Sequence, residues 1–129
     1  MNAPSPFRPH RTGFVMGFKY AGEGLLYALR TQRNFRFHLV MAIVVVLTGY
    51  WLQLSFAAWA VLMLTIGFVV VTEMVNTAAE TLVDMVSPDY HPLAKQVKDL
   101  AAGAVLVTAI VAVGVGLMIL GPPLLALLR

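Results

Sequence analysis

Five polar side chains between positions 73 and 84 have the types and the spacing of a chemical site. They are Glu73, Asn76, Thr77, Glu80 and Asp84. On a helix that turns about 100° per residue, all of them fall within roughly 60° of one line, so they share a single face. Carboxylates stacked in this way repel one another unless a cation or basic side chains lie against them. We call this set the acidic face.

Three interpretations of the acidic face are open, and the first is a helix end whose charges are simply solvated. The second is a proton or ion relay, although such relays place an acid near the bilayer midplane. The third is metal-assisted phosphoryl transfer, in which carboxylates hold Mg²⁺, basic groups neutralise phosphate and one acid takes a proton from a hydroxyl. In that case an acceptor hydroxyl meets Glu73, and a nucleotide meets Glu80, Lys98 and Asp99.

The composition predicts that the acidic face belongs to a membrane protein. The chain has 129 residues, of which 60% are hydrophobic and only 12% are charged, against about 25% charged in soluble domains. The net charge is +3, but the apolar runs are far too long for a basic DNA-binding domain, so no nucleic-acid partner is expected. The chain has no cysteine, which excludes disulfides.

The elements that must position the acidic face form an all-α integral membrane fold of one domain, over 13–129. A proline-containing tail, 1–12, is expected to be disordered. Apolar residues at spacings of three and four predict an amphipathic helix over 13–30 that lies in the membrane interface. Three apolar runs predict transmembrane helices over 36–54, 56–86 and 93–120. The prolines of Gly121-Pro122-Pro123 are expected to end the last helix.

Charge placement predicts the orientation of these helices. Every Lys and Arg except Arg129 lies before the first span or near the 87–92 loop. The positive-inside rule then puts the N-terminus in the cytoplasm and the C-terminus outside, for a multi-pass protein of the plasma (inner) membrane. The run from Phe56 to Thr72 covers about 25 Å of a slab about 30 Å thick, so Glu73 is expected near the cytoplasmic interface.

Several sequence blocks resemble the small prokaryotic membrane kinases that phosphorylate diacylglycerol or undecaprenol. The specific signal is the ExxNxxxE block at 73–80, followed by Lys98-Asp99 and the small residues of 101–105. Similar blocks stand at 18–21, 33–38 and 89–95, so the resemblance covers nearly everything after the tail. The Arg33-Asn34 and Tyr90-His91-Pro92 versions are similar to the Gram-positive-type branch, whose members often prefer undecaprenol.

The resemblance implies a homotrimeric lipid kinase that uses ATP and Mg²⁺. It implies that Glu73 is the general base on the lipid hydroxyl and that Glu80 binds Mg²⁺ together with ATP. It further implies that Asn76 orients the site and that Arg36, with its neighbour Asn34, approaches the lipid alcohol, which is undecaprenol or diacylglycerol. The remaining residues implied for the nucleotide pocket are Tyr20, Gln32, Asp89, Tyr90, His91, Lys98 and Asp99.

Position 32 departs from the family pattern. Most relatives carry there a glutamate that shares the metal with the acid matching Glu80, whereas this chain has Gln32. A glutamine carbonyl still ligates Mg²⁺ but brings no charge, so Glu23 or Asp84 is a candidate substitute acid. The alternative hypothesis is a weakened or inactive relative that acts as a lipid-binding membrane protein. His38 is interpreted as an interface or structural histidine.

Overall fold

The computed structural model describes residues 13–127, which form four helices and no strand. The helices are α1 (Phe14–Thr31), α2 (Arg33–Trp51), α3 (Phe56–Val86) and α4 (Pro92–Leu127). The all-α class predicted from the sequence is confirmed. The tail over 1–12 and Arg129 lie outside the described residues.

Three of these helices, α2, α3 and α4, are long and apolar enough to cross a membrane. With 31 residues, α3 is about 46 Å long, whereas a hydrocarbon slab is about 30 Å thick. Its last turns therefore extend beyond the slab, as the sequence predicts. The first span runs over Arg33–Trp51 rather than 36–54, so its boundaries lie three residues earlier at each end.

The end predicted for the last helix is wrong. Pro122 and Pro123 lie inside α4, which continues to Leu127 instead of ending at 120. Two prolines remove two backbone donors and leave carbonyls one turn earlier without their usual partners. Membrane helices tolerate this loss where neighbouring groups or local adjustments satisfy the freed carbonyls.

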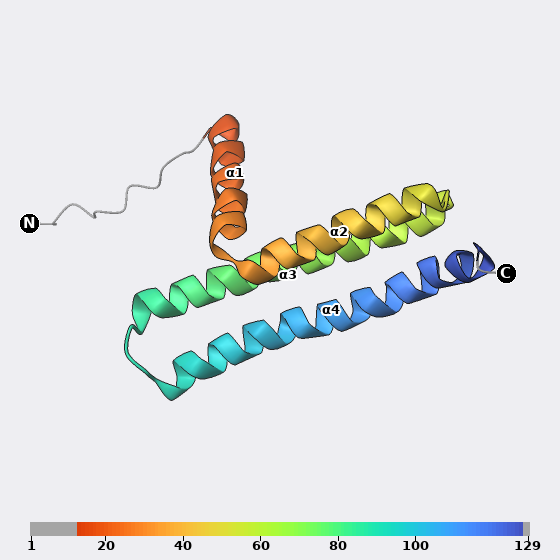
Figure 1. The fold of residues 1–129 in the computed structure, drawn as a ribbon. Coiled ribbons are helices and arrows are strands. Elements are labelled where there is room, and N and C mark those ends of the chain that lie inside the picture. The colour runs from red at the N-terminus through yellow and green to blue at the C-terminus, as the bar shows by residue number, and fades with distance from the viewer. Residues whose placement is uncertain (1–12, 128–129) are drawn as a thin grey trace, which may run out of the picture.

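The helices form an elongated bundle with one helix set apart (Figure 1). The main interface joins α3 and α4, α2 packs against α3, and α2 touches α4 only slightly. Helix α1 runs crosswise to the other three and contacts α2 and α3. Few apolar side chains are buried inside the chain, and most large ones are exposed. Lipid or other copies must therefore cover this surface.

A tight turn joins α2 to α3. Gln53 has a φ of 52°, the left-handed region that non-glycine residues rarely adopt. The backbone of Gly49 lies against the next helix, because an added Cβ would come within 3.2 Å of the Trp59 ring. Ser55 then begins α3, since its Oγ accepts a hydrogen bond of 3.3 Å from the Ala58 N–H. The turn thereby fixes α2 and α3 as an antiparallel pair.

A single residue separates α1 from α2. Gln32 has extended backbone angles, so the chain changes direction there. The Arg36 guanidinium reaches back across this break, and its Nη1 donates to the carbonyl oxygens of Leu29 at 3.2 Å and Arg30 at 3.0 Å. These carbonyls belong to the last turn of α1, which lacks helical donors and carries partial negative charge. Arg36 therefore caps α1 from α2.

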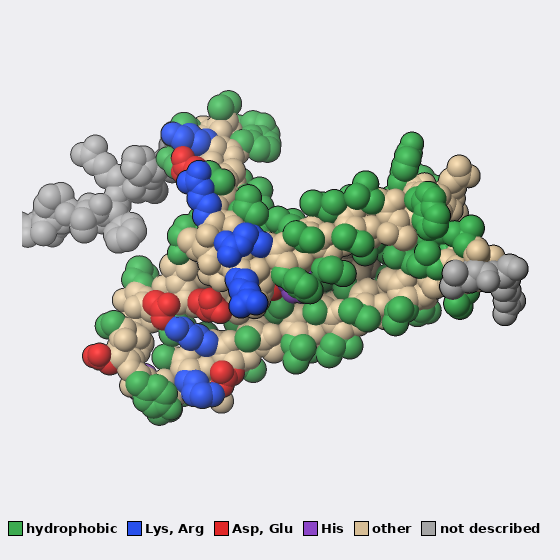
Figure 2. Space-filling view, in the orientation of Figure 1, with side chains coloured by type: hydrophobic (Ala, Val, Ile, Leu, Met, Phe, Trp, Pro, Cys, Tyr) green, Lys and Arg blue, Asp and Glu red, His purple; other side chains and the backbone are tan. Residues whose placement is uncertain are grey.

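The loop over 87–91 joins α3 to α4 at one end of the bundle. The Leu93 N–H donates to Nδ1 of His91 at 3.2 Å, so this imidazole caps the start of α4. Acidic and basic side chains gather at this end, whereas hydrophobic ones cover the opposite half of the visible face (Figure 2). We call the charged end, with α1 and the 87–91 loop, the polar end.

Candidate active site

Glu73 is the most deeply buried ionisable side chain among the described residues. Only 1% of its surface is exposed, although it lies on α3 where the long apolar run ends. The hydroxyl of Thr77 donates to the backbone carbonyl of Glu73 at 3.0 Å rather than to its carboxylate, and Oε1 of that carboxylate has no hydrogen-bond partner among residues 13–127. A buried carboxylate without hydrogen bonds is costly, so its retention indicates a chemical role.

One histidine approaches this carboxylate from the neighbouring helix. The Nε2 of His38, on α2, lies 3.1 Å from Oε1 of Glu73. The two atoms are close, yet the contact lacks hydrogen-bond alignment, and within residues 13–127 Oε1 accepts no hydrogen bond. Helical periodicity alone does not reveal this pair, because it does not give the register between two helices. Counting from the turn places both residues at similar depth within about 6 Å, which is the signal that could have found them.

One turn further along α3, Asn76 restrains Glu80. The Asn76 side chain is buried, and its Nδ2 donates to Oε1 of Glu80 at 3.0 Å. Its own oxygen, Oδ1, is buried and has no hydrogen-bond partner among the described residues. An unpartnered amide oxygen and a carboxylate thus lie one turn apart on the same face of α3.

The donor types at this point fit a small hard cation. Mg²⁺ takes oxygen ligands and uses one or two carboxylates together with water and substrate phosphates, rather than an all-protein cage. The orphaned Asn76 Oδ1 and the half-buried Glu80 carboxylate are ligands of this kind. Residues 13–127 contain no cluster of three His, Cys, Asp or Glu side chains that could hold a metal. Asn76 and Glu80 are therefore a partial ligand set, and a Mg²⁺ ion held by them would need further oxygen ligands such as water or phosphate.

The polar end holds a cavity of about 400 Å³ between α3, the 87–91 loop and α4. Five of the residues implied for nucleotide binding by the sequence line this cavity, although they come from different segments. They are Asp89, Tyr90, His91, Lys98 and Asp99. The fold thus brings the loop and the Lys98-Asp99 pair together, as a shared pocket requires.

The charges around this cavity are paired within the chain. Lys98 Nζ lies 2.5 Å from Oδ1 of Asp84, which links α4 to α3. Lys95 pairs with Asp99 along α4. All of these side chains are exposed or half-buried, so water and salt screen both pairs. The two ion pairs therefore stabilise the cavity walls only weakly, and a ligand can compete for their charged groups.

Other implied site residues lie away from that cavity. Tyr20 is on α1 and is 48% exposed, and Gln32 is half-buried in the break between α1 and α2; neither lines the cavity. Asn34 is exposed in the first turn of α2, beside the Arg36 that caps α1. Glu23 is exposed and lies 3.9 Å from Lys19.

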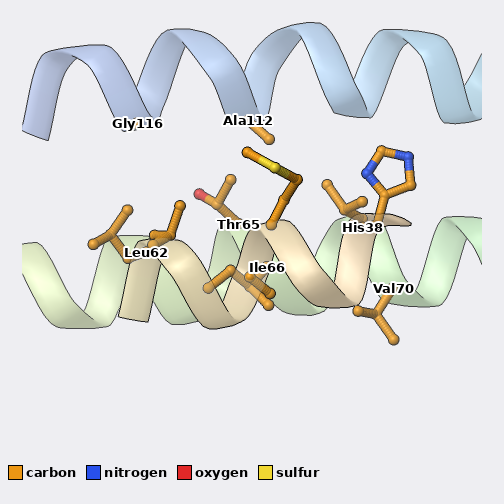
Figure 3. Close-up of a pocket in the computed structure, with 11 residues that line it drawn as sticks. His38, Leu62, Thr65, Ile66, Val70, Ala112 and Gly116 are labelled. Carbon is orange, nitrogen blue, oxygen red and sulfur yellow. The ribbon is translucent and has the colours of Figure 1, made fainter. Parts of the chain in front are cut away.

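An apolar groove leads away from His38 between α2 and α4. A cavity of about 90 Å³ extends from His38 to Gly116, with Ala112 of α4 along one side (Figure 3). A more open groove of about 440 Å³ shares His38 and Gly116 with it and continues to Leu124. Small residues of α4 keep this groove open where α2 and α4 scarcely touch. An apolar chain lying in it would place its polar end beside the His38–Glu73 pair.

Three membrane-length helices carry a buried carboxylate on α3 and, about 15 Å further along that helix, a charged cavity that starts at Val83. This arrangement is typical of an integral membrane protein with a site at one end of its bundle. The family model of prokaryotic diacylglycerol kinase matches residues 19–120, and the chain belongs to this family. Membership of this family favours the phosphoryl-transfer interpretation of the acidic face over the relay and solvated-charge interpretations, and its residue roles stay predictions.

Curated relatives agree with this assignment. Undecaprenol kinase of Bacillus subtilis is 42% identical over 111 residues, which are 86% of this chain and 90% of the relative. Diacylglycerol kinase of Synechocystis sp. is 49% identical over 115 residues, 88% of this chain and 66% of the relative. Diacylglycerol kinase of Escherichia coli is 33% identical over 105 residues, with coverage of 79% and 86%. The enzyme class predicted from the sequence, a lipid kinase, is confirmed.

Proposed function

We propose that this protein transfers the γ-phosphate of ATP to the hydroxyl of a membrane lipid alcohol, in a Mg²⁺-dependent reaction with Glu73 as general base. The observation that carries the proposal is the Glu73 carboxylate, which is buried, has an unpartnered oxygen and lies where the apolar part of α3 ends. A carboxylate in this position is ready to accept a proton from a hydroxyl at headgroup depth.

The proposed role of each residue on α3 follows from its position along the helix. Glu73 takes the proton as the lipid oxygen attacks the γ-phosphorus and the bond to the bridging oxygen of ADP breaks. Asn76 and Glu80, one and two turns further along, would hold Mg²⁺, and the bound metal would supply charge neutralisation for the phosphates. Lys98 offers a cation at the wall of the charged cavity. Asp89, Tyr90 and His91 close that cavity around the rest of the nucleotide.

The acceptor class is a lipid alcohol with a long apolar chain, either undecaprenol or diacylglycerol. The relatives named for these two activities support the class. The groove between α2 and α4 supports it independently, because it is lined by apolar and small side chains and starts at His38. A chain in this groove directs its hydroxyl toward Glu73. Asn34, in the first turn of α2, lies at headgroup depth in this arrangement.

The same proposal covers the membrane arrangement. The charged residues of the polar end face the cytoplasm, where ATP is found, which places the N-terminus inside and the C-terminus outside. Helix α1 runs crosswise to the spans with Phe14 and Phe18 exposed, the orientation of a helix that lies in the interface. A homotrimer, implied by the family resemblance, would cover part of the exposed apolar surface.

Phosphoryl transfer from labelled ATP tests the proposal directly. Purified protein in lipid micelles should label undecaprenol or diacylglycerol when Mg²⁺ is present, and the two lipids should be assayed side by side. Glu73→Gln should lower turnover by about three orders of magnitude or more. Thr72→Val is the matched control, since that hydroxyl donates only to the Phe68 carbonyl of its own helix. Wild-type turnover in Glu73→Gln rules out Glu73 as the base.

A second candidate function rests on Gln32. A relative without a charged ligand at this position could retain lipid binding while phosphorylating nothing. Folded protein that labels neither lipid at any Mg²⁺ concentration would favour this function over the kinase. Labelling of either lipid excludes it.

A further inference from the structure

His38 is placed to control the carboxylate that carries the proposed proton transfer. Its side chain is 19% exposed and that of Glu73 is 2% exposed. The contact of 3.1 Å therefore lies largely out of water, where a polar interaction is stronger than at the surface. Within the described chain, no other side chain donates to this carboxylate, since the Thr77 hydroxyl and the Asn76 amide are directed elsewhere.

The surroundings of the imidazole limit its movement. Its ring makes an edge-on contact with Phe37, with centroids 5.6 Å apart. On the other side it borders the apolar cavity that runs to Gly116 (Figure 3). Apart from Thr65, whose hydroxyl donates to the Val61 carbonyl, the side chains that line this cavity with His38 are apolar. A small rotation of the ring toward Glu73 would give Nε2 a hydrogen bond.

We propose that His38 is the positioning residue for Glu73. Its Nε2–H aligns with Oε1 when the acceptor lipid fills the site, which turns Oε2 toward the acceptor hydroxyl. In the transfer step the O–H bond of the lipid breaks and its proton passes to Glu73, while the lipid oxygen bonds to the γ-phosphorus and ADP leaves. His38 exchanges no proton in this step. The inference rests on the proposed function, because it acts through Glu73 as the base.

Three substitutions in the full-length protein separate positioning from packing. Glutamine carries a donor at about the place of Nε2, asparagine carries one only at about the place of Nδ1, and leucine fills the space without any donor. The assay measures kcat and KM for lipid and for ATP, with size-exclusion chromatography as the check on folding. The asparagine and glutamine variants form the decisive pair, since both are polar and the comparison holds even if His38→Leu misfolds.

The expected result is a loss in kcat that depends on where the donor lies. His38→Asn and His38→Leu should lower kcat about 10-fold to 100-fold with KM values nearly unchanged, while His38→Gln stays within about threefold of wild type. Equal kcat in all three variants overturns the proposal, and so does a loss confined to KM. Wild-type protein that transfers no phosphate, or an active Glu73→Gln variant, rejects the proposed function instead.

A readout without turnover tests the contact itself. In protein labelled with ¹⁵N histidine, the Nε2 resonance of His38 should shift when Glu73 is replaced by glutamine, while the resonances of His91 stay in place. The lipid alcohol, added without ATP, should shift the same resonance in wild type as Nε2 aligns with Oε1. A His38 resonance that responds to neither change contradicts the proposed alignment.

Discussion

Asn76 donates its amide to the Glu80 carboxylate at 3.0 Å, one helical turn away on α3. The bond restrains one carboxylate oxygen of Glu80, and the Asn76 amide oxygen itself has no partner among residues 13–127. Asn76 thus lies between the buried Glu73 and the half-buried Glu80 on the acidic face and restrains the second of them. Groups that orient a metal ligand in this way influence metal affinity strongly.

The first prediction concerns this bond. Asn76→Leu keeps the approximate volume but removes both the donor to Glu80 and the unpartnered oxygen. The Mg²⁺ concentration for half-maximal activity should rise about 10-fold to 100-fold. Thr81→Val is the control, because that hydroxyl bonds only to the Thr77 carbonyl of the same helix. If the Mg²⁺ concentration for half-maximal activity does not change, Asn76 is not part of the metal site.

The second prediction concerns the ion pair between Lys98 and Asp84. Lys98→Met removes a cation from the cavity wall and should raise KM for ATP about tenfold, whereas Asp84→Asn frees Lys98 and should lower it. Both changes should alter the unfolding free energy by less than about 1 kcal/mol, since the pair is exposed. Lys19→Met, on α1, serves as the charge-matched control. If both variants lose stability while KM for ATP stays constant, Lys98 has a structural role only.

The third prediction concerns the apolar groove. Gly116 lines it, and a Cβ added there meets no atom within 4 Å. Gly116→Leu should therefore fold and fill the groove, raising KM about tenfold for a long-chain lipid alcohol and less for a short-chain one. Gly114→Leu is the control on the same helix, with equally open space but outside the groove. Equal effects of the two variants would show that the chain binds elsewhere.

The fourth prediction concerns Gln32. Gln32→Glu restores the acid that the family resemblance implies at this position, and it should lower the Mg²⁺ concentration needed for half-maximal activity by about tenfold. Gln96→Glu places the same charge change on α4 near the polar end and should have no such effect. If both variants and wild type need the same Mg²⁺ concentration, the residue at position 32 does not bind the metal.

The helices are the part of the fold that the sequence predicts well. Long uncharged apolar runs have few alternatives to spanning helices, so the spans lie within three residues of the predicted starts. The predicted end of α4 is wrong because prolines end helices readily in water, where the freed carbonyls are solvated, whereas Pro122 and Pro123 lie inside an apolar membrane-length helix.

Contacts between helices are the part of the site that the sequence does not give. Helical periodicity places Glu73, Asn76 and Glu80 on one face, but it carries no information about which α2 residue lies opposite. The approach of His38 depends on the tight turn at Gln53, and the capping of α1 by Arg36 depends on the break at Gln32. The lipid role expected for Arg36 stays a prediction, because its guanidinium is engaged by α1 carbonyls.

Only Gln32 separates α1 from α2, and the Arg36 side chain bridges this break. The orientation of α1 therefore follows that of α2. When a bilayer is thinner than the hydrophobic length of a span, the span tilts to fit. Because Arg36 ties the last turn of α1 to the first turn of α2, a tilt of α2 would turn α1 with it relative to α3. Spin labels on α1 and α3 should therefore report distances that change with the acyl-chain length of the bilayer, and Arg36→Gln should weaken that dependence. The enzyme would in this way sense the thickness of the membrane from which it draws its substrate.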